Sequence, residues 1–219
     1  MKCQLKISNI EIRVPCPNEG VHRTGTIRTL LSTHIDVVGK KVVDLGAGPC
    51  IFSRIARHAG AHVTAVDGRV DRLPDKEILG SIEFIQSDVR DFDTRDFDVK
   101  FVFGLLYHLE FEDQVKLLEN CAQSGITIID TQVHRENLIA SYPQDPWQYV
   151  LHKRGDLNGI EFLEGTNTMA SIGNRTSFWP TEESLIEMIR AAGFRQLTIV
   201  DPAYVSKYGV RRFMICSQF

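Results

Sequence analysis

The feature that most constrains the fold is a β-branched run that breaks into a glycine turn and then continues at helical spacing. The run begins at Val42, the turn holds Gly46 and Gly48, and the segment 51–57 after it carries apolar residues at helical intervals. This layout of strand, turn and helix brings backbone N–H groups and a helix N-terminus up to a ligand, and glycine keeps side chains away from it. We therefore predict an α/β domain that binds a ligand at this turn.

The turn differs from the dinucleotide-binding fingerprint G-x-G-x-x-G, because Ile51 stands where that pattern has its third glycine. With Asp44 in front, the segment resembles the first motif of class I S-adenosylmethionine (SAM)-dependent methyltransferases, which reads acidic-x-G-x-G-x-G. Cys50 replaces the last glycine of that motif. The resemblance implies that Asp44, Gly46 and Gly48 bind the SAM cofactor.

Length, charge and cysteine content bound the other possibilities. The 219 residues suit one domain. A formal net charge of −3 gives no electrostatic footprint for non-specific nucleic-acid binding, although RNA held by a local patch stays open. Five cysteines without a C-x-x-C pair argue against a disulfide framework and a zinc site. Since the sequence has neither an apolar run of spanning length nor a signal-peptide pattern, we expect a cytoplasmic protein with no membrane partner.

Asp67 ends the second predicted strand, which we place at 61–67. It lies roughly twenty residues beyond the glycine turn, the spacing at which a carboxylate accepts both hydroxyls of a ribose. A carboxylate suits two hydroxyl donors because it only accepts hydrogen bonds, and Gly68 after it allows a close approach. We therefore assign Asp67 and Gly68 to cofactor binding.

Asp88 and Val89 follow the third predicted strand, which we place at 82–86. The segment resembles the third motif of the same methyltransferases, which implies that Asp88 accepts a hydrogen bond from the adenine amino group. The resemblance also implies that the backbone amide of Val89 donates to the adenine ring. Asp91 is the alternative to Asp88 if the turn is one step longer.

The segment 97–109 resembles the FDxV…GxLYHL stretch of this family, in which a fourth strand runs into a short turn. The resemblance implies that Gly104 and Leu105 line the position of the transferable methyl group. It places Tyr107 and His108 next to the methyl acceptor.

Two histidines follow strands whose carboxyl ends should face the ligand, namely His108 after the fourth strand and His134 after the fifth strand, at 125–130. A hydroxyl acceptor needs a base, and the ordinary pKa of histidine lies near working pH, so both are catalytic candidates. Asp130 is a third candidate, which orients a histidine, binds the acceptor or caps a turn. The acid–Asn pair of metal-dependent O-methyltransferases does not occur in the sequence, so we predict no metal.

Residues 135–179 show little periodicity but many aromatic and polar groups, which is typical of a functional insertion. The family builds its substrate cap at this place, after the fifth strand. We therefore assign Arg175 and Trp179, together with Tyr107, to substrate binding.

The order of these motifs predicts the whole fold. The resemblance covers residues 40–216 and implies an α/β architecture, with a Rossmann-like seven-stranded, mostly parallel sheet, helices on both faces and a cap insertion after strand 5. We expect a single domain over 1–219, with an N-terminal cover at 1–38 and a substrate cap at 131–180. The other predicted elements are a strand at 5–14, helices at 26–35, 112–122 and between Thr181 and Gly193, and closing strands at 195–200 and 211–216.

A narrower resemblance bears on the acceptor. Residues 174–181, with 193–194 and 105–109, are similar to the enzymes that carboxymethylate wobble uridine in tRNA and to related methyltransferases of sugars and small metabolites. The long N-terminal region expected of the tRNA enzymes is missing from this sequence. We therefore predict that the chain transfers a methyl group from SAM to a hydroxyl or amine of a small-molecule or saccharide-like acceptor and releases S-adenosyl-L-homocysteine (SAH).

Other functions stay open at this point. A tRNA-modifying methyltransferase is the first alternative, and a SAM-binding protein without catalysis is another. Arg23 or Arg28 either meets the SAM carboxylate or an anionic substrate, or is solvated. A carboxylated SAM as donor and a homodimer also remain open.

Overall fold

The computed structural model describes residues 9–15, 23–135, 149–154, 156–164, 172–201, 203–206 and 209–218. The predicted strand before residue 9, and the parts of the predicted cap at 136–148 and 165–171, lie outside the described residues. So do Cys3 and Cys16.

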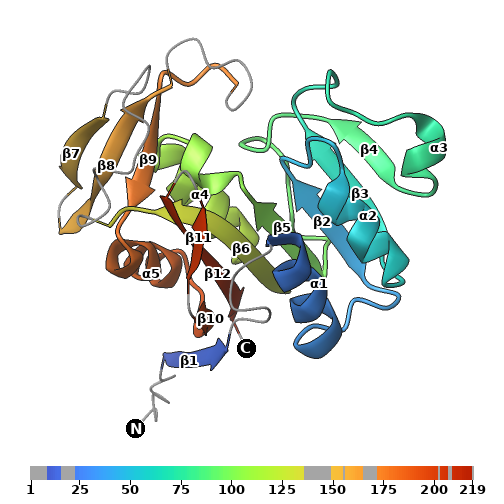
Figure 1. Cartoon of the computed structure of the whole chain (residues 1–219), viewed down its shortest axis with the longest axis horizontal. Coiled ribbons are helices and arrows are strands. Elements are labelled where there is room, and N and C mark those ends of the chain that lie inside the picture. Colours follow the sequence, from blue (N-terminus) through green and yellow to red (C-terminus); the bar gives the residue numbers. More distant parts are fainter. Residues whose placement is uncertain are drawn as a thin grey trace, which may run out of the picture.

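A mixed β-sheet forms the centre of the molecule (Figure 1). In the described residues it has nine strands, with the order β1-β10-β12-β6-β5-β2-β3-β4 and with β11 paired to β12. Their bounds are Ile10–Pro15 (β1), Lys41–Leu45 (β2), His62–Asp67 (β3), Glu83–Gln86 (β4), Val99–Phe103 (β5), Ile126–Val133 (β6), Gln196–Asp201 (β10), Tyr204–Ser206 (β11) and Gly209–Ser217 (β12).

Strands β6, β5, β2, β3 and β4 run parallel, whereas β12 is antiparallel to both β6 and β10. This mostly parallel sheet with an antiparallel closing pair confirms the predicted Rossmann-like α/β class. The sheet is larger than the predicted seven strands because β1 pairs in parallel with β10 and β11 pairs with β12.

The central strands are buried on both faces, as their composition predicts. In β2, Val42, Val43 and Leu45 are fully buried. In β5, Lys100 is also fully buried, and its Nζ donates to the side-chain oxygen of Ser124 at 2.8 Å. Burial lowers the pKa of Lys100, since a low-dielectric environment disfavours the charged form.

Helices cover both faces of the sheet, as predicted. The apolar residues of α1 and α2 belong to one buried cluster, and those of α4 and α5 belong to a second. The helices are α1 (Arg23–Thr33), α2 (Ile51–His58), α3 (Lys76–Leu79), the 3₁₀ turn η2 (Leu106–His108), α4 (Phe111–Cys121) and α5 (Glu182–Ala191). Thr181 caps α5, because its side chain accepts from the backbone N–H of Ser184 at 3.2 Å. Within the described ranges, every helix is too short or too polar to cross a membrane.

A second, three-stranded antiparallel sheet lies at the opposite end of the view from β4 and α3 (Figure 1). It consists of β7 (Tyr149–Arg154), β8 (Leu157–Leu163) and β9 (Thr176–Pro180). These segments therefore form regular strands although the sequence between 135 and 179 shows little periodicity. Ile160 and Phe162 of β8 and Phe178 and Trp179 of β9 are buried, so cross-strand packing supports strands that a scan for long periodic runs misses.

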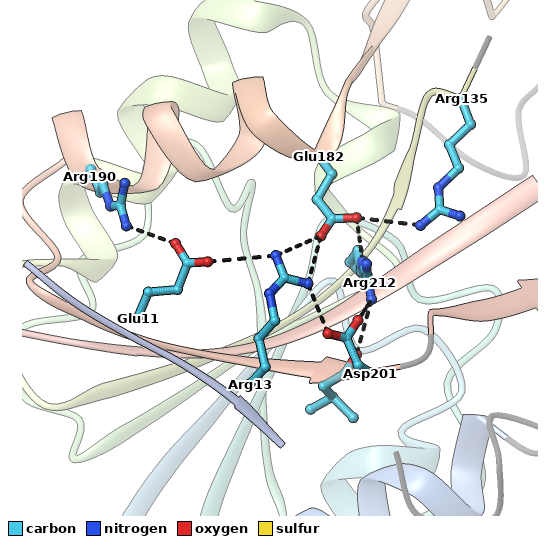
Figure 2. Close-up of polar contacts among 8 residues, drawn as sticks. Glu11, Arg13, Arg135, Glu182, Arg190, Asp201 and Arg212 are labelled. Carbon is cyan, nitrogen blue, oxygen red and sulfur yellow. Dashed lines mark hydrogen bonds and ion pairs between the residues drawn. The ribbon is translucent and has the colours of Figure 1, made fainter. Parts of the chain in front are cut away.

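Ion pairs hold the edge strand β1 to the body of the protein (Figure 2). β1 is largely exposed, so apolar burial contributes little to its attachment. Arg13 of β1 contacts Asp201 at 2.8 Å and Glu182 at 3.5 Å, and Glu11 contacts Arg190 at 2.8 Å. We call this group the β1 ion-pair network; it comprises Glu11, Arg13, Arg135, Glu182, Arg190, Asp201 and Arg212.

Candidate functional site

The carboxyl ends of β2, β3, β4 and β5 surround one cavity of about 310 Å³, which we call the strand-end cavity. A volume of this order suits a small organic ligand. The predicted cofactor residues that line it are Gly46, Gly48, Asp67, Gly68, Asp88, Val89, Gly104 and Leu105. Tyr107 and His108 line it as well. Motifs that lie about 60 residues apart in the sequence, from the glycine turn to His108, therefore meet at this cavity.

The glycine turn after β2 needs residues without side chains. Gly46 and Gly48 have φ angles of 69° and 49°, and a Cβ on Gly46 would lie 2.9 Å from Cδ1 of Leu105. Cys50, which replaces the last glycine of the motif, also has a left-handed φ of 54°. A side chain in this conformation costs roughly 1–2 kcal/mol, which explains why glycine suits the position.

Asp67 ties the ends of two neighbouring strands together. Its Oδ2 accepts from the backbone N–H of Gly48 at 2.8 Å, and its Oδ1 accepts from that of Arg69 at 2.9 Å. Each carboxylate oxygen can accept a second hydrogen bond. The side chain is therefore fixed in place and still able to take two hydroxyl donors from the cavity.

Asp88 lies at the end of β4, where the guanidinium of Arg90 holds it. Nε of Arg90 lies 3.0 Å from both carboxylate oxygens, and these hydrogen bonds lower the pKa of Asp88. Arg90 also donates to the carbonyl oxygen of Ile172 at 3.0 Å. Asp88 lines the cavity, whereas Asp91 is not among the described lining residues.

Asp130 lies within β6, opposite Phe103 at the end of β5, and is fully buried between two arginines. Arg211 donates to it through Nε at 2.8 Å and through a terminal nitrogen at 3.1 Å, and Nε of Arg23 donates from the other side. Burial opposes ionisation, but the guanidinium groups of Arg211 and Arg23 outweigh it and keep the pKa of Asp130 below its ordinary value. We call these three residues the Arg23–Asp130–Arg211 cluster.

The Arg23–Asp130–Arg211 cluster leaves one donor unused. The NH2 group of Arg23 is buried and has no hydrogen-bond partner in the described part of the chain. It lies beside the end of β5, because a Cβ on Gly104 would approach it to 2.7 Å. Arg23 also lines the strand-end cavity.

Tyr107 and His108 form the wall of the cavity beyond Gly104. Arg211 donates to the hydroxyl oxygen of Tyr107 at 3.2 Å and lies 4.9 Å from the centre of its ring. Nδ1 of His108 lies 3.5 Å from a carboxylate oxygen of Glu164, which is buried just after β8. This wall of the cavity therefore carries a histidine that contacts a carboxylate.

The other predicted residues lie away from the cavity lining. Asp44 is buried and accepts from the hydroxyl of Ser53 at 2.5 Å, and burial raises its pKa to about 6. His134 is buried where β6 meets α5, and its backbone N–H donates to Pro180. Trp179 donates to the carbonyl oxygen of Tyr107 at 3.0 Å from behind the wall.

Arg175 is exposed and makes its described contacts through the backbone. The substrate role of Arg175 and Trp179, and the catalytic role of His134, stay predictions. The sequence analysis missed Glu164, Arg211 and Arg90, which holds Asp88. Two adjacent arginines in the apolar strand β12 were a usable signal for Arg211, whereas Glu164 is one acid in a stretch without a motif.

Comparison with known proteins places the same segment in a known family. Residues 42–124 match the family model of a methyltransferase domain. These residues run from β2 to the end of α4 and contain the glycine turn, Asp67, Asp88 and the Tyr107–His108 turn.

Two characterised relatives and one solved structure extend the likeness. The cypemycin N-terminal methyltransferase of Streptomyces sp is 28% identical, with 81% of each chain covered. The demethylmenaquinone methyltransferase of Clavibacter sepedonicus is 28% identical, with 81% of this chain and 73% of the relative covered. The crystal structure of Burkholderia thailandensis 1,6-didemethyltoxoflavin-N1-methyltransferase, with bound 1,6-didemethyltoxoflavin and SAH, has a TM-score of 0.59 at 21% identity and covers 88% of this chain and 76% of that one.

Proposed function

Because this chain belongs to the class I SAM-dependent methyltransferases, we propose that it transfers a methyl group from SAM to a small-molecule or saccharide-like acceptor bound beside Tyr107 and His108. The observation that carries the proposal is the convergence of Asp67, Asp88 and the glycine turn on one cavity. In open α/β sheets, ligands bind outside the carboxyl ends of the strands, which is where this cavity lies.

The residues around the cavity fit SAM part by part. The Gly46–Gly48 turn lines the cavity without side chains, and the carboxylate of Asp67 suits the two ribose hydroxyls. Asp88 and the amide of Val89 suit the adenine edge. The unpaired N–H donor of Arg23 suits the carboxylate of the methionine part, because a buried donor without a partner is costly until a ligand accepts from it.

When bound, SAM supplies a methyl group that is already activated on a positive sulfur. The protein then has to hold the acceptor atom about 3–3.5 Å from that methyl group and keep water away. Gly104 and Leu105 line the cavity together with Tyr107 and His108. We propose that His108 takes a proton from the acceptor.

A small-molecule acceptor agrees with the size of the cavity and with the Burkholderia neighbour, whose structure contains bound 1,6-didemethyltoxoflavin and SAH. A net charge of −3 gives no support to general RNA binding. If tRNA were the acceptor, binding of tRNA would be tight and would weaken steeply with added salt. A filter-binding assay with tRNA therefore distinguishes a tRNA acceptor from a small-molecule acceptor.

The test is isothermal titration calorimetry with SAH, SAM and NAD as separate ligands. We expect SAH and SAM to bind and NAD not to bind. Asp67→Asn should weaken SAH binding about tenfold or more, because an amide replaces one of two acceptor oxygens with a donor. Asp71→Asn, an exposed acid four residues further on, is the matched control and should bind like the wild type. Equal SAH affinity in Asp67→Asn and the wild type would contradict the ribose assignment.

A further inference from the structure

The short turn η2, which carries Tyr107 and His108, is held in place by the second sheet and the segment before it. Three consecutive carbonyl oxygens of this turn accept hydrogen bonds from that side. Asn174 donates to His108 at 2.8 Å, Trp179 donates to Tyr107 at 3.0 Å, and the amide of Phe178 donates to Leu109 at 3.0 Å. A catalytic side chain works best when its supporting backbone is fixed in this way.

The same region supplies the carboxylate that faces the His108 ring. Glu164 follows β8 directly, and its backbone N–H donates to the carbonyl oxygen of Arg175 at 2.9 Å. Its side chain is only 2% exposed, whereas that of His108 is 20% exposed toward the cavity. Their contact joins Nδ1 of His108 to Oε1 of Glu164 at 3.5 Å.

Asp130, which the sequence offered as the partner of a histidine, is already engaged. Its Oδ1 accepts from Arg211 and its Oδ2 accepts from both Arg211 and Arg23, and its contacts in the described residues include neither His108 nor His134. Of the two carboxylates, Glu164 is the one that lies against a histidine of the cavity wall.

We infer that Glu164 is a positioning residue that holds His108 with its proton on Nδ1, so that Nε2 is the base for a hydroxyl group of the acceptor. The inference rests on the proposed methyl transfer. The hydrogen bond made by one ring nitrogen of histidine decides which nitrogen carries the proton. A carboxylate at Nδ1 therefore leaves a lone pair on Nε2, the nitrogen on the far side of the ring from Glu164.

This arrangement selects hydroxyl acceptors. In the transfer, the hydroxyl oxygen forms a bond to the methyl carbon, the sulfur–methyl bond breaks and its electron pair stays on sulfur. The hydroxyl proton moves to Nε2 of His108, and the Glu164 carboxylate stabilises the resulting imidazolium. A neutral amine attacks with its own lone pair and loses a proton afterwards, so it gains less from a base placed in advance.

The first measurement reads the protonation state of His108 directly on the protein. Nitrogen-15 NMR of histidine-labelled wild-type protein at about pH 8.5, with the signal assigned through His108→Gln, reports which ring nitrogen carries the proton. We expect Nδ1–H in the wild type and a shift of the population toward Nε2–H in Glu164→Ala. A wild-type ring with its proton on Nε2 would overturn the inference, and this holds even if Glu164→Ala does not fold.

The second measurement is methyl transfer from radiolabelled SAM to catechol and D-fucose as hydroxyl probes and to aniline as the amine probe. Glu164→Gln, which keeps the size but removes the charge, should lower kcat for the hydroxyl probes about tenfold and leave KM and the SAH dissociation constant unchanged. Glu110→Gln is the matched control, since Glu110 accepts from the backbone of Arg175 and not from the His108 ring. Preferential transfer to aniline, or equal hydroxyl rates in Glu164→Gln and the wild type, would overturn the inference.

The two proposals fail in different ways. If SAH does not bind the wild type, the proposed function is wrong, whereas the tautomer of His108 is still measured. If SAH binds and the His108 proton lies on Nε2, the methyltransferase assignment stands and the role of Glu164 is wrong.

Discussion

Two arginine–carboxylate groups lie on the same sheet, one at the strand-end cavity and the other at the edge strand β1. Arg211 and Arg212 are neighbours in β12, and because side chains alternate along a strand they leave on opposite faces. Arg211 joins the Arg23–Asp130–Arg211 cluster at the strand-end cavity, and Arg212 joins the β1 ion-pair network (Figure 2).

The two groups differ in burial and in one unused donor. Arginines outnumber carboxylates by one in both groups, with four to three in the β1 ion-pair network and two to one in the Arg23–Asp130–Arg211 cluster. Asp130 and Arg211 are buried, whereas the Arg13 side chain is 47% exposed. Arg23, which lines the strand-end cavity, keeps a buried nitrogen without a hydrogen-bond partner in the described residues, and we propose that an anionic group of the ligand binds there.

The largest effect is expected from Asp130→Asn. Removing the charge leaves two guanidinium groups without their common partner, and breaking a buried pair in this way costs about 3–5 kcal/mol of unfolding free energy. Urea denaturation at pH 7 measures it. A loss below about 1 kcal/mol would show that the cluster is no more important for stability than an exposed ion pair.

The pH dependence of stability tests the charge of Asp130 independently. The pKa of Asp130 is lowered in the folded protein, so its stabilisation is present above the ordinary carboxyl pKa of about 4 and is lost as the pH falls below it. The difference in stability between the wild type and Asp130→Asn should therefore shrink below about pH 4. A difference that does not change with pH would contradict the assignment of the charge.

An intermediate effect is expected from Arg23→Gln, which tests the unpaired donor. SAH affinity should fall roughly tenfold or more, since a hydrogen bond to a charged group contributes about 1.5–3 kcal/mol. Arg28→Gln, on the same helix but exposed, is the control and should bind SAH normally. Calorimetry measures the SAH affinity of both variants. Equal losses of SAH affinity in the two variants would show that Arg23 contributes no more to binding than an exposed arginine does.

The smallest effect is expected from Arg13→Gln in the β1 ion-pair network. The Arg13 side chain is 47% exposed, so its loss should cost no more than about 1 kcal/mol, and less at high salt. Its SAH affinity should equal that of the wild type. A large loss of SAH binding would mean that the network supports the cavity and that the two groups are not separate in function.

Local patterns made much of this site predictable. The glycine turn, Asp67 and Asp88 stand at the ends of apolar strands, and parallel strands bring their carboxyl ends to one edge, so sequence order was enough to predict that they meet. The N-terminal cap of α5 is also a local feature. It depends on a contact between Thr181 and Ser184, three residues further along the chain.

Contacts between distant segments were not predictable in this way. Glu164 meets His108 across 56 residues, and only the pairing of β8 with β9 brings them together. Asp130 was recognised as a candidate, but its two arginines come from α1 and β12, at the two ends of the chain. The side on which Arg211 and Arg212 emerge depends on the register of β12 with β6, which one residue of slip would reverse.

The most direct test of the account is a crystal structure of the wild-type protein with SAH. We predict that the ribose hydroxyls lie at hydrogen-bonding distance, about 2.6–3.2 Å, from the Asp67 carboxylate, with the sulfur facing Tyr107 and His108. A nucleoside bound elsewhere, or an Asp67 carboxylate that contacts only the backbone of its own turn, would contradict the account.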